Sequence, residues 1–248
     1  MLEFPDVPEG GSIEQLISCA QVDGFPTGSV ECLRTPYVTV AGTDLEGKSW
    51  KDRISTKFRS RMRRARKNIA ALGKLEFHQH GEADPSLLQQ FYEIEASGWK
   101  GHANTAIANH PKIRLYYDEI ARAASEKGYF ALNFFELNGK PIAADFGLTY
   151  GGTFYGAKAG YDEAFRSYGP GHLLVEEELL DCDTRGLQRF DFLGKGEEWK
   201  WRWTSEFRKH SIWFVFRNDW YGRLAKFAKF HATPLIKKLL GRPAEMST

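Results

Sequence analysis

A glycine-containing loop that leads into an apolar helix is the segment best suited to bind a phosphate. Residues 158–186 read KAGYDEAFRSYGPGHLLVEEELLDCDTRG, and Arg166, Gly169 and Gly171 give the spacing R-x-x-G-x-G. Glycines let backbone N–H groups approach an anion, and the start of a helix adds unpaired donors and partial positive charge. The spacing predicts that the amides from Gly169 to Leu173 bind a pyrophosphate. A simple strand-to-helix turn is the alternative.

Four side chains around this loop could assist an anionic ligand or a reacting group. Arg166 would add a charge-assisted contact to a phosphate, unless it is a solvated loop arginine. His172 could face the phosphate or cap the helix. Tyr161, at the end of the preceding strand, could donate to a developing negative charge. Lys158 lies on the same strand and is a candidate substrate-binding residue.

Three carboxylates are candidates for proton transfer. Asp145 lies in the middle of the otherwise apolar IAADFGL, and a buried carboxylate there needs a partner or a raised pKa. If it points out of a half-exposed sheet, it is ordinary. Asp191 alternates with Phe190 and Phe192, so it faces away from them and toward a cleft. Glu95 ends a helix in EIEASGWKG and is a candidate general base; from the residues alone, an exposed glutamate is the alternative.

Two stretches concentrate positive charge, although the net charge of the whole chain is only +2. KFRSRMRRARK, residues 57–67, holds seven basic residues and no acid. As a helix it would expose Arg59, Arg63, Arg66 and Lys67, a stripe that could contact RNA or anionic lipid, or simply be solvated. Residues 219–240 are also basic and amphipathic. They fit packing on the domain or contact with an anionic membrane, and Pro234 favours packing.

Composition narrows the class of protein. With 248 residues, 42% hydrophobic and 14% aromatic, the chain can build a substantial core. Three cysteines without metal-like spacing and no signal peptide indicate a reducing, cytoplasmic setting. No apolar run is long enough to span a bilayer, and the scattered histidines predict no metal site.

The elements that position these residues follow from periodicity and turn signals. Residues 48–72 have helical spacing, residues 74–80 look like a strand, and Pro85 and Pro111 open helices that end near residues 97 and 127. Residues 129–137, 142–150 and 153–160 then form strands joined by the turns Asn138-Gly139 and Gly151-Gly152. The first 55 residues predict only a short helix and a short strand at 36–40.

A helix and two strands complete the pattern. Residues 171–185 form a helix whose apolar face includes Leu173, Leu174, Glu177, Leu179 and Leu180. Residues 188–194 and 211–216 are strand-like. A parallel strand following that helix would lie beside the strand before it, by the right-handed crossover rule. The helix start between two diverging strands is then a suitable place for a pyrophosphate.

Several segments resemble a known family. The loop and its surroundings resemble the acyl-CoA pyrophosphate loop of the GNAT acetyltransferase superfamily, and more closely the CelD/BcsL-type acetyltransferases of exopolysaccharide synthesis, relatives of the FemAB peptidyltransferases. The carrying segments, between about residues 50 and 205, are FRSRMRRARKNIAALGKLEF, EIEASGWKGHANTAI, NGKPIAADFGLTYGGTFYGAKAGYDEAFRSYGPGHLL and FDFLGKGEEWKWRW.

The resemblance implies an α/β (α+β) GNAT-like fold, with a mixed, mostly antiparallel sheet flanked by helices. It implies acyl transfer from acetyl-CoA or another acyl-CoA to an amine or hydroxyl of a sugar or cell-envelope precursor. The E-x-x-x-W-K-G pattern places Glu95, Trp99 and Lys100 in the site. Lys200 in EEWKWRW resembles the lysine that Fem-type enzymes use near an acceptor's phosphate. Glu95, or Asp145 through a water, would take the proton, and Tyr161 would assist the leaving thiolate.

Two rival functions remain open from the sequence. One is a Fem-like transferase that draws amino acids from aminoacyl-tRNA, with the arginine-rich helix holding the tRNA. The other is a GNAT-fold scaffold without catalysis. This second function is considered because members of the family usually carry a first GNAT-like half ahead of this region, and that half would be expected to shape part of the acceptor site. The expected division is therefore a remnant of that half at 1–47, the acyltransferase domain at 48–217 and a basic tail at 218–248. A cytoplasmic protein, with a peripheral membrane contact as an option, is the expected location.

Overall fold

The computed structural model describes residues 1–42, 49–97 and 106–232. Its strands are β1 (Leu2–Pro8), β2 (Thr27–Thr39), β3 (Leu75–His80), β4 (Phe130–Leu137), β5 (Lys140–Tyr150), β6 (Thr153–Tyr161), β7 (Arg189–Asp191) and β8 (Phe207–Val215). Its α-helices are α1 (Ser12–Val22), α2 (Trp50–Arg53), α3 (Thr56–Ala70), α4 (Pro85–Ala96), α6 (Pro111–Glu126), α7 (Pro170–Thr184) and α8 (Trp220–Phe227). Short helices are η1 (Ile107–Asn109), η2 (Glu163–Tyr168), η3 (Lys200–Arg202) and the π-helical η4 (Ala228–Ala232).

The chain divides into two compact units. The first holds the described residues of 1–36, 194–197 and 207–248, and the second those of 37–193 and 198–206. Strand hydrogen bonding runs in the order β1-β8-β2-β7-β6-β5-β4-β3. Residues 27–36 of β2 pair with β8 in the first unit, and residues 37–39 pair with β7 in the second. The three-part division expected from the sequence stays a prediction.

The three-strand meander of the second unit is confirmed. β3, β4, β5 and β6 pair antiparallel in succession. Asn138 and Gly139 have φ of 53° and 74°, and Gly151 and Gly152 have φ of 56° and 74°. Two consecutive residues at positive φ match the right-handed twist of the flanking strands, which is why Asn-Gly and Gly-Gly close these hairpins.

The parallel return strand is also confirmed. After α7, β7 pairs parallel with the start of β6, from Thr153↔Arg189 to Tyr155↔Asp191. β6 continues to Tyr161 and keeps β5 on its other side. In the described part of the chain, residues 156–161 of β6 therefore have no strand partner on the β7 side. α7 begins close to this unpaired edge.

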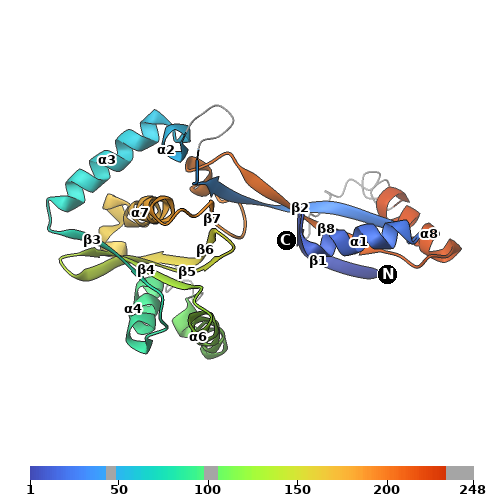
Figure 1. Cartoon of the computed structure of the whole chain (residues 1–248), viewed down its shortest axis with the longest axis horizontal. Coiled ribbons are helices and arrows are strands. Elements are labelled where there is room, and N and C mark those ends of the chain that lie inside the picture. Colours follow the sequence, from blue (N-terminus) through green and yellow to red (C-terminus); the bar gives the residue numbers. More distant parts are fainter. Residues whose placement is uncertain (43–48, 98–105, 233–248) are drawn as a thin grey trace. The chain divides into compact units, whose positions relative to one another are not determined.

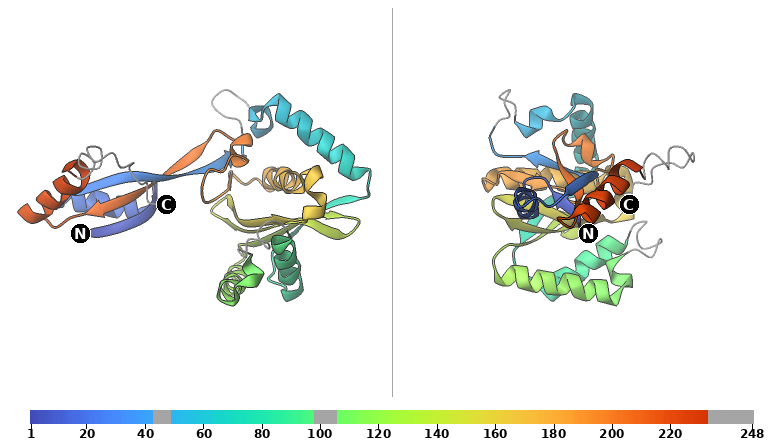
Figure 2. Two further views of the ribbon diagram at one scale, coloured as in Figure 1. Left: turned by 180° about the vertical axis from the view of Figure 1, so that it is seen from behind. Right: turned by 90° about the vertical axis from the view of Figure 1, so that its right-hand side faces the viewer.

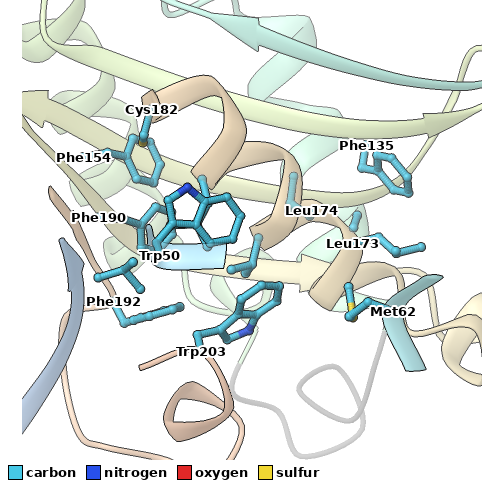
Figure 3. Close-up of a cluster of buried hydrophobic side chains, with 14 of the residues drawn as sticks. Trp50, Met62, Phe135, Phe154, Leu173, Leu174, Cys182, Phe190, Phe192 and Trp203 are labelled. Atoms are coloured by element: carbon cyan, nitrogen blue, oxygen red, sulfur yellow. The ribbon is translucent and has the colours of Figure 1, made fainter. Parts of the chain in front are cut away.

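Helices cover both faces of the second unit's sheet. α7 lies on one face with α3 beside it, and α4 and α6 lie on the other (Figures 1 and 2). One core packs between α7, α3 and the sheet, where Trp50, Trp203, Phe190 and Leu174 meet (Figure 3). A second core lies under α4 and α6 and includes Phe91, Phe134 and Phe146. The mixed, mostly antiparallel sheet with flanking helices is the expected fold class.

The helix expected over residues 48–72 is two helices. Ile54 has ψ of 135°, which ends α2, and the Ser55 hydroxyl then accepts the Phe58 N–H at 3.3 Å to cap α3. Trp50, Ile54 and Phe58 are all buried, so their helical spacing is real. Hydrophobic spacing does not reveal the break, because both sides of it contribute to the same core.

The first unit pairs β1 and β2 with opposite edges of β8, all antiparallel. The strand expected at 36–40 is thus the end of a much longer one. The helix expected over 219–240 is α8 followed by η4, and its remaining residues lie outside the described chain. Phe230 packs inward, but Leu224 and Phe227 are exposed, so for these two the expected packing is wrong. Across the described ranges, no helix has the length and apolarity to cross a membrane.

Candidate active site

Glu95 and Lys158, distant in sequence, meet where α4 packs on β6. Glu95 is buried, its Oε2 accepts the Ile107 N–H at 2.9 Å, and its Oε1 lies 3.4 Å from Lys158 Nζ. Gly160 permits this packing, because a Cβ there would lie 2.6 Å from the Cα of Glu95. The alternative of an exposed helix-end glutamate is therefore wrong. The lysine and the Ile107 amide give this buried carboxylate two polar partners, which offset the cost of its burial.

Asp145 is buried against a second carboxyl, Glu178 of α7. Asn133 Nδ2 donates to Glu178 Oε1 at 2.9 Å, and Glu178 is hydrogen-bonded to Asp145. Burial, and then the charge of Asp145, raise the pKa of Glu178 well above its usual value. Two adjacent buried carboxyls disfavour the doubly ionised form, so the pair favours retention of a proton. The pair therefore lies in the contact between β5 and α7.

Glu178 is a residue that the sequence reasoning missed. The apolar face of α7 was expected to include Glu177, but Glu177 binds Arg66 of α3 at 2.5 Å, while Glu178 is buried. The available signal was the i±4 spacing of Leu174, Glu178 and Cys182, all three buried. Arg66 also binds Glu176 at 2.5 Å, so the expectation that Arg66 belongs to a solvated stripe is wrong. Its ion pairs join α3 to α7.

The candidate phosphate loop is a short 3₁₀-helix followed by a left-handed turn. Gly169 has φ of 63° between η2 and α7. The amide of Gly169 donates to the Arg166 carbonyl, and those of His172 and Leu173 donate to the Gly169 carbonyl at 3.1 and 3.2 Å. Pro170 has no N–H, so Gly171 carries the first-turn amide that helix geometry leaves without an acceptor. Of the amides expected to bind a pyrophosphate, Gly171 is the one best placed.

Tyr161 lies beside this amide. A Cβ on Gly171 would be 3.5 Å from Tyr161 Cδ1. Burial, and then the nearby charge of Glu163, raise the pKa of Tyr161, so the hydroxyl stays protonated and can donate a hydrogen bond. Arg166 instead forms an exposed ion pair with Glu163 at 2.9 Å. Arg166 is therefore held within η2 by a surface contact.

His172 packs into an aromatic cluster. Its ring lies 5.3 Å from Phe58, 6.0 Å from Trp203 and 6.2 Å from Trp199, measured between ring centroids. Burial, followed by the charges of Arg202 and Arg61, lowers the pKa of His172 to about 4. The imidazole is thus neutral near pH 7, and Nδ1 is buried without a partner in the described structure. The positive charge near the start of α7 comes from these two arginines.

A basic cavity of about 530 Å³ opens beside the aromatic cluster, and Arg53, Lys57, Arg61 and Arg202 are among the residues that line it. Two of these cations already have acidic partners: Arg53 binds Glu206 and the Thr39 carbonyl, and Arg202 binds Glu198. Lys57 and Arg61 have no ion pair within the described ranges and are the cations left for a ligand. The residues that line it are Arg53, Ser55, Lys57, Phe58, Arg61, Trp201, Arg202, Thr204 and Ser205.

Asp191 and Lys200 are brought together around one residue, Leu193. Asp191 Oδ1 accepts the Leu193 N–H at 2.9 Å, and Lys200 Nζ donates to the Leu193 carbonyl at 2.8 Å. Leu193 has φ of 48°, which is unfavourable for a side chain with a Cβ. Both groups are buried and hold this turn. Trp99 and Lys100 lie outside the described residues.

The candidate residues form two sets on opposite faces of β6. Gly160 faces α4, where Glu95 and Lys158 lie, so Tyr161, the next residue, faces α7. Asp145, Glu178 and the Gly171 amide are on the α7 side as well. The two sets are separated by the stretch of β6 that β7 does not cover. Within the described ranges, no group of three or more histidine, cysteine or acidic side chains could hold a metal ion.

Comparisons with known proteins agree with this geometry. Residues 56–201 match the family model described as acetyltransferase (GNAT) domain. No curated protein matches the chain in sequence. Among solved structures, FemX aligns with a TM-score of 0.61 at 14% identity, covering 86% of this chain and 71% of that one.

Two further structures are similar to the chain. The C-terminal domain of a protein from Agrobacterium fabrum, described as a lysylphosphatidylglycerol synthetase, gives a TM-score of 0.55 at 13% identity and covers 94% of this chain and 72% of that one. L-PGS from Bacillus licheniformis gives 0.53 at 10% identity, with 86% and 67% coverage. Identities this low show a shared fold.

Proposed function

Since the chain belongs to the acetyltransferase (GNAT) domain family, we propose that it transfers an acyl group from acetyl-CoA, or another acyl-CoA, to an amine or hydroxyl. The observation that carries the proposal is the start of α7. There the Gly171 amide lies at the unpaired edge of β6, and the charges of Arg61 and Arg202 reach the neighbouring His172. A free helix-start amide with nearby guanidinium groups is suited to a pyrophosphate.

The residues on the α7 side fit such a coenzyme. Gly171, Arg61 and Lys57 would hold its phosphates, and the bound coenzyme would supply the acyl group as a thioester. Neutral His172 and the surrounding aromatic rings exclude water from the base of this region. The Tyr161 hydroxyl, protonated because its pKa is raised, can donate to a developing negative charge.

The residues on the α4 side fit an acceptor. Glu95 is buried and has a cationic partner 3.4 Å away in Lys158, so its carboxylate can take a proton from an attacking amine or hydroxyl. The Asp145–Glu178 pair lies on the α7 side, and the raised pKa of Glu178 suits that carboxyl to hold a proton rather than to accept one from the substrate. The resemblance to the CelD/BcsL-type acetyltransferases supports a sugar or exopolysaccharide precursor as the acceptor.

Calorimetric titration with acetyl-CoA tests the proposal. Gly169→Asp places a carboxylate at the loop, and we expect micromolar binding to be lost. Gly186→Asp is the matched control, because Gly186 has φ of 68° at the opposite end of α7, and a Cβ meets nothing within 4 Å at either glycine. Equal loss of binding in both variants would contradict the proposed phosphate contact.

A Fem-like reaction with aminoacyl-tRNA is the second candidate. The basic face of α3 favours it: Lys57, Arg59, Arg61, Arg63, Arg64 and Lys67 are all exposed. The likeness to FemX concerns the fold. Binding of tRNA with a steep dependence on salt, without binding of acetyl-CoA, would support this candidate. If neither ligand binds, a GNAT-fold scaffold without catalysis is the remaining interpretation.

A further inference from the structure

The last α-helix of the first unit presents its apolar side chains to solvent. Trp220, Tyr221, Leu224 and Phe227 of α8 are 75%, 60%, 54% and 59% exposed. Spacings of four and three residues put Trp220, Leu224 and Phe227 on one side of the helix. A surface helix normally turns such a stripe toward the core. Contiguous exposed apolar side chains mark an interaction site.

Contacts on the other side of α8 fix this orientation. Gly222 is buried, and a Cβ there would lie 2.0 Å from the Arg217 carbonyl oxygen. In η4, Phe230 packs edge-on against Phe214, 5.9 Å between ring centroids, and covers Gly28, where a Cβ would lie 2.4 Å from its ring. Because these contacts leave no space to rotate the helix, Trp220, Leu224 and Phe227 stay outward.

Cations lie directly beside the apolar stripe. A cavity of about 400 Å³ is lined by Gly24, Pro26, Arg223, Lys226, Phe227 and His231. Arg223 and Lys226 have no ion pair in the described structure, and none of these lining residues is acidic. The His231 ring lies against Phe227, 5.2 Å between ring centroids. The cavity therefore combines two available cations with the edge of the apolar stripe.

We propose that α8 docks on an anionic lipid surface. Trp220, Leu224 and Phe227 enter the boundary between headgroups and acyl chains, while Arg223 and Lys226 bind lipid phosphates. Tryptophan and tyrosine favour this boundary, and juxtaposed lysine and arginine are attracted to acidic lipids. The two cations without ion pairs at the edge of the stripe complement the negative charge of acidic headgroups, and this charge complementarity is the reason for proposing a lipid surface. The inference is independent of acyl transfer, because α8 lies outside the family match.

Vesicle co-sedimentation of the full chain tests this docking. We expect binding to vesicles of phosphatidylcholine mixed with phosphatidylglycerol, and none to phosphatidylcholine alone. Leu224→Asp should abolish binding. Its matched control is Leu16→Asp, the same change at a position of α1 in the same unit that is 56% exposed. Charge reversal of Arg223 and Lys226 to glutamate should weaken binding about tenfold or more, whereas Lys209→Glu on β8 should have little effect.

Tryptophan fluorescence gives a second readout. A blue shift on adding anionic vesicles should disappear in Trp220→Phe and remain in Trp201→Phe. The proposal is overturned if the wild-type chain binds neither vesicle type, or if Leu16→Asp lowers binding as much as Leu224→Asp. It is also overturned if light scattering shows a dimer that Leu224→Asp converts to a monomer, because the stripe would then be an interface between two copies.

Discussion

Lys158 Nζ lies 3.4 Å from Glu95 Oε1, across the contact between β6 and α4. The lysine is on the strand that leads to the phosphate loop, and the glutamate is on the opposite face of β6 from that loop. The ion pair therefore joins β6, the strand that precedes the phosphate loop, to α4, the helix that carries the proposed general base. The proximity of a lysine and a buried carboxylate at this position is the geometric reason for proposing Glu95 as the general base.

Glu95→Gln should lower kcat/KM for acyl transfer by about a hundredfold or more, because the amide cannot accept the proton. Affinity for acetyl-CoA should change little, since the coenzyme is proposed to lie on the α7 side. The measurements are acyl-transfer kinetics, calorimetry and urea unfolding. Glu93→Gln, an exposed position of the same helix, is the control. A Glu95→Gln variant with full activity would remove Glu95 from the mechanism.

Glu178→Gln should change how stability depends on pH. Burial and Asp145 raise the pKa of Glu178 above its ordinary value of 4.5, so the folded state holds a proton that the unfolded chain releases. The wild-type free energy of unfolding therefore falls as pH rises above this ordinary value. Glutamine can still receive the Asn133 hydrogen bond and donate to Asp145.

Urea unfolding at a series of pH values above it measures the effect. The Glu178→Gln variant should lose stability less steeply than the wild type as pH rises. Glu177→Gln is the matched control, because Glu177 is the adjacent residue but binds Arg66 at the surface. Identical pH slopes for wild type and Glu178→Gln would show that Glu178 is charged in the folded protein.

Local signals predicted most of the second unit. The change from helical to alternating spacing after Gly128, and the two hairpin turns, identified the meander, and chain handedness identified the parallel return of β7. These features depend on neighbouring residues, which a sequence displays. The end of β7 was less legible, because Leu193 leaves the strand through a left-handed conformation that few leucines adopt.

Features that depend on packing between distant segments were not predictable. Glu95 and Lys158 are joined only when α4 packs on Gly160, and His172 is enclosed by rings from residues 58, 199 and 203. The choice between Glu177 and Glu178 for the buried face required the rotation of α7, since adjacent helical residues point about 100° apart. The two neighbouring glutamates therefore have different partners: Glu177 forms an ion pair with Arg66, whereas Glu178 is buried beside Asp145.

His172→Phe should protect the protein against acid. The pKa of His172 is lowered from 6.5 to about 4 by burial and by Arg202 and Arg61, so the unfolded chain binds a proton that the folded state does not. Stability is then lost as pH falls from about 6.5 to 4, by at most about 3 kcal/mol. Phenylalanine fills the aromatic cluster without titrating.

Acid unfolding followed by circular dichroism checks this expectation. The difference in unfolding free energy between His172→Phe and the wild type should grow in favour of the variant between pH 6.5 and pH 4. His78→Phe, on β3 of the same unit, is the control, because His78 is more exposed. A constant difference across this range would mean that His172 titrates alike in both states.

Lys200 is expected to act mainly by stabilising the turn at Leu193. Its Nζ donates to the carbonyl of Leu193, whose φ is 48°. Lys200→Ala should lower the free energy of unfolding by roughly 1–3 kcal/mol, because the partly buried carbonyl loses its donor. Adding Leu193→Gly should restore part of this loss, since glycine adopts positive φ without a Cβ penalty.

The double variant separates structure from substrate contact. If Lys200 only holds the turn, the restored stability of Lys200→Ala/Leu193→Gly should bring restored acyl-transfer kinetics. If Lys200 also binds the acceptor, KM for the acceptor should stay raised in the double variant although stability has recovered. Urea unfolding and steady-state kinetics on the wild type, Lys200→Ala, Leu193→Gly and the double variant give both answers. A Lys200→Ala variant with wild-type stability would show that the Leu193 turn does not depend on this hydrogen bond.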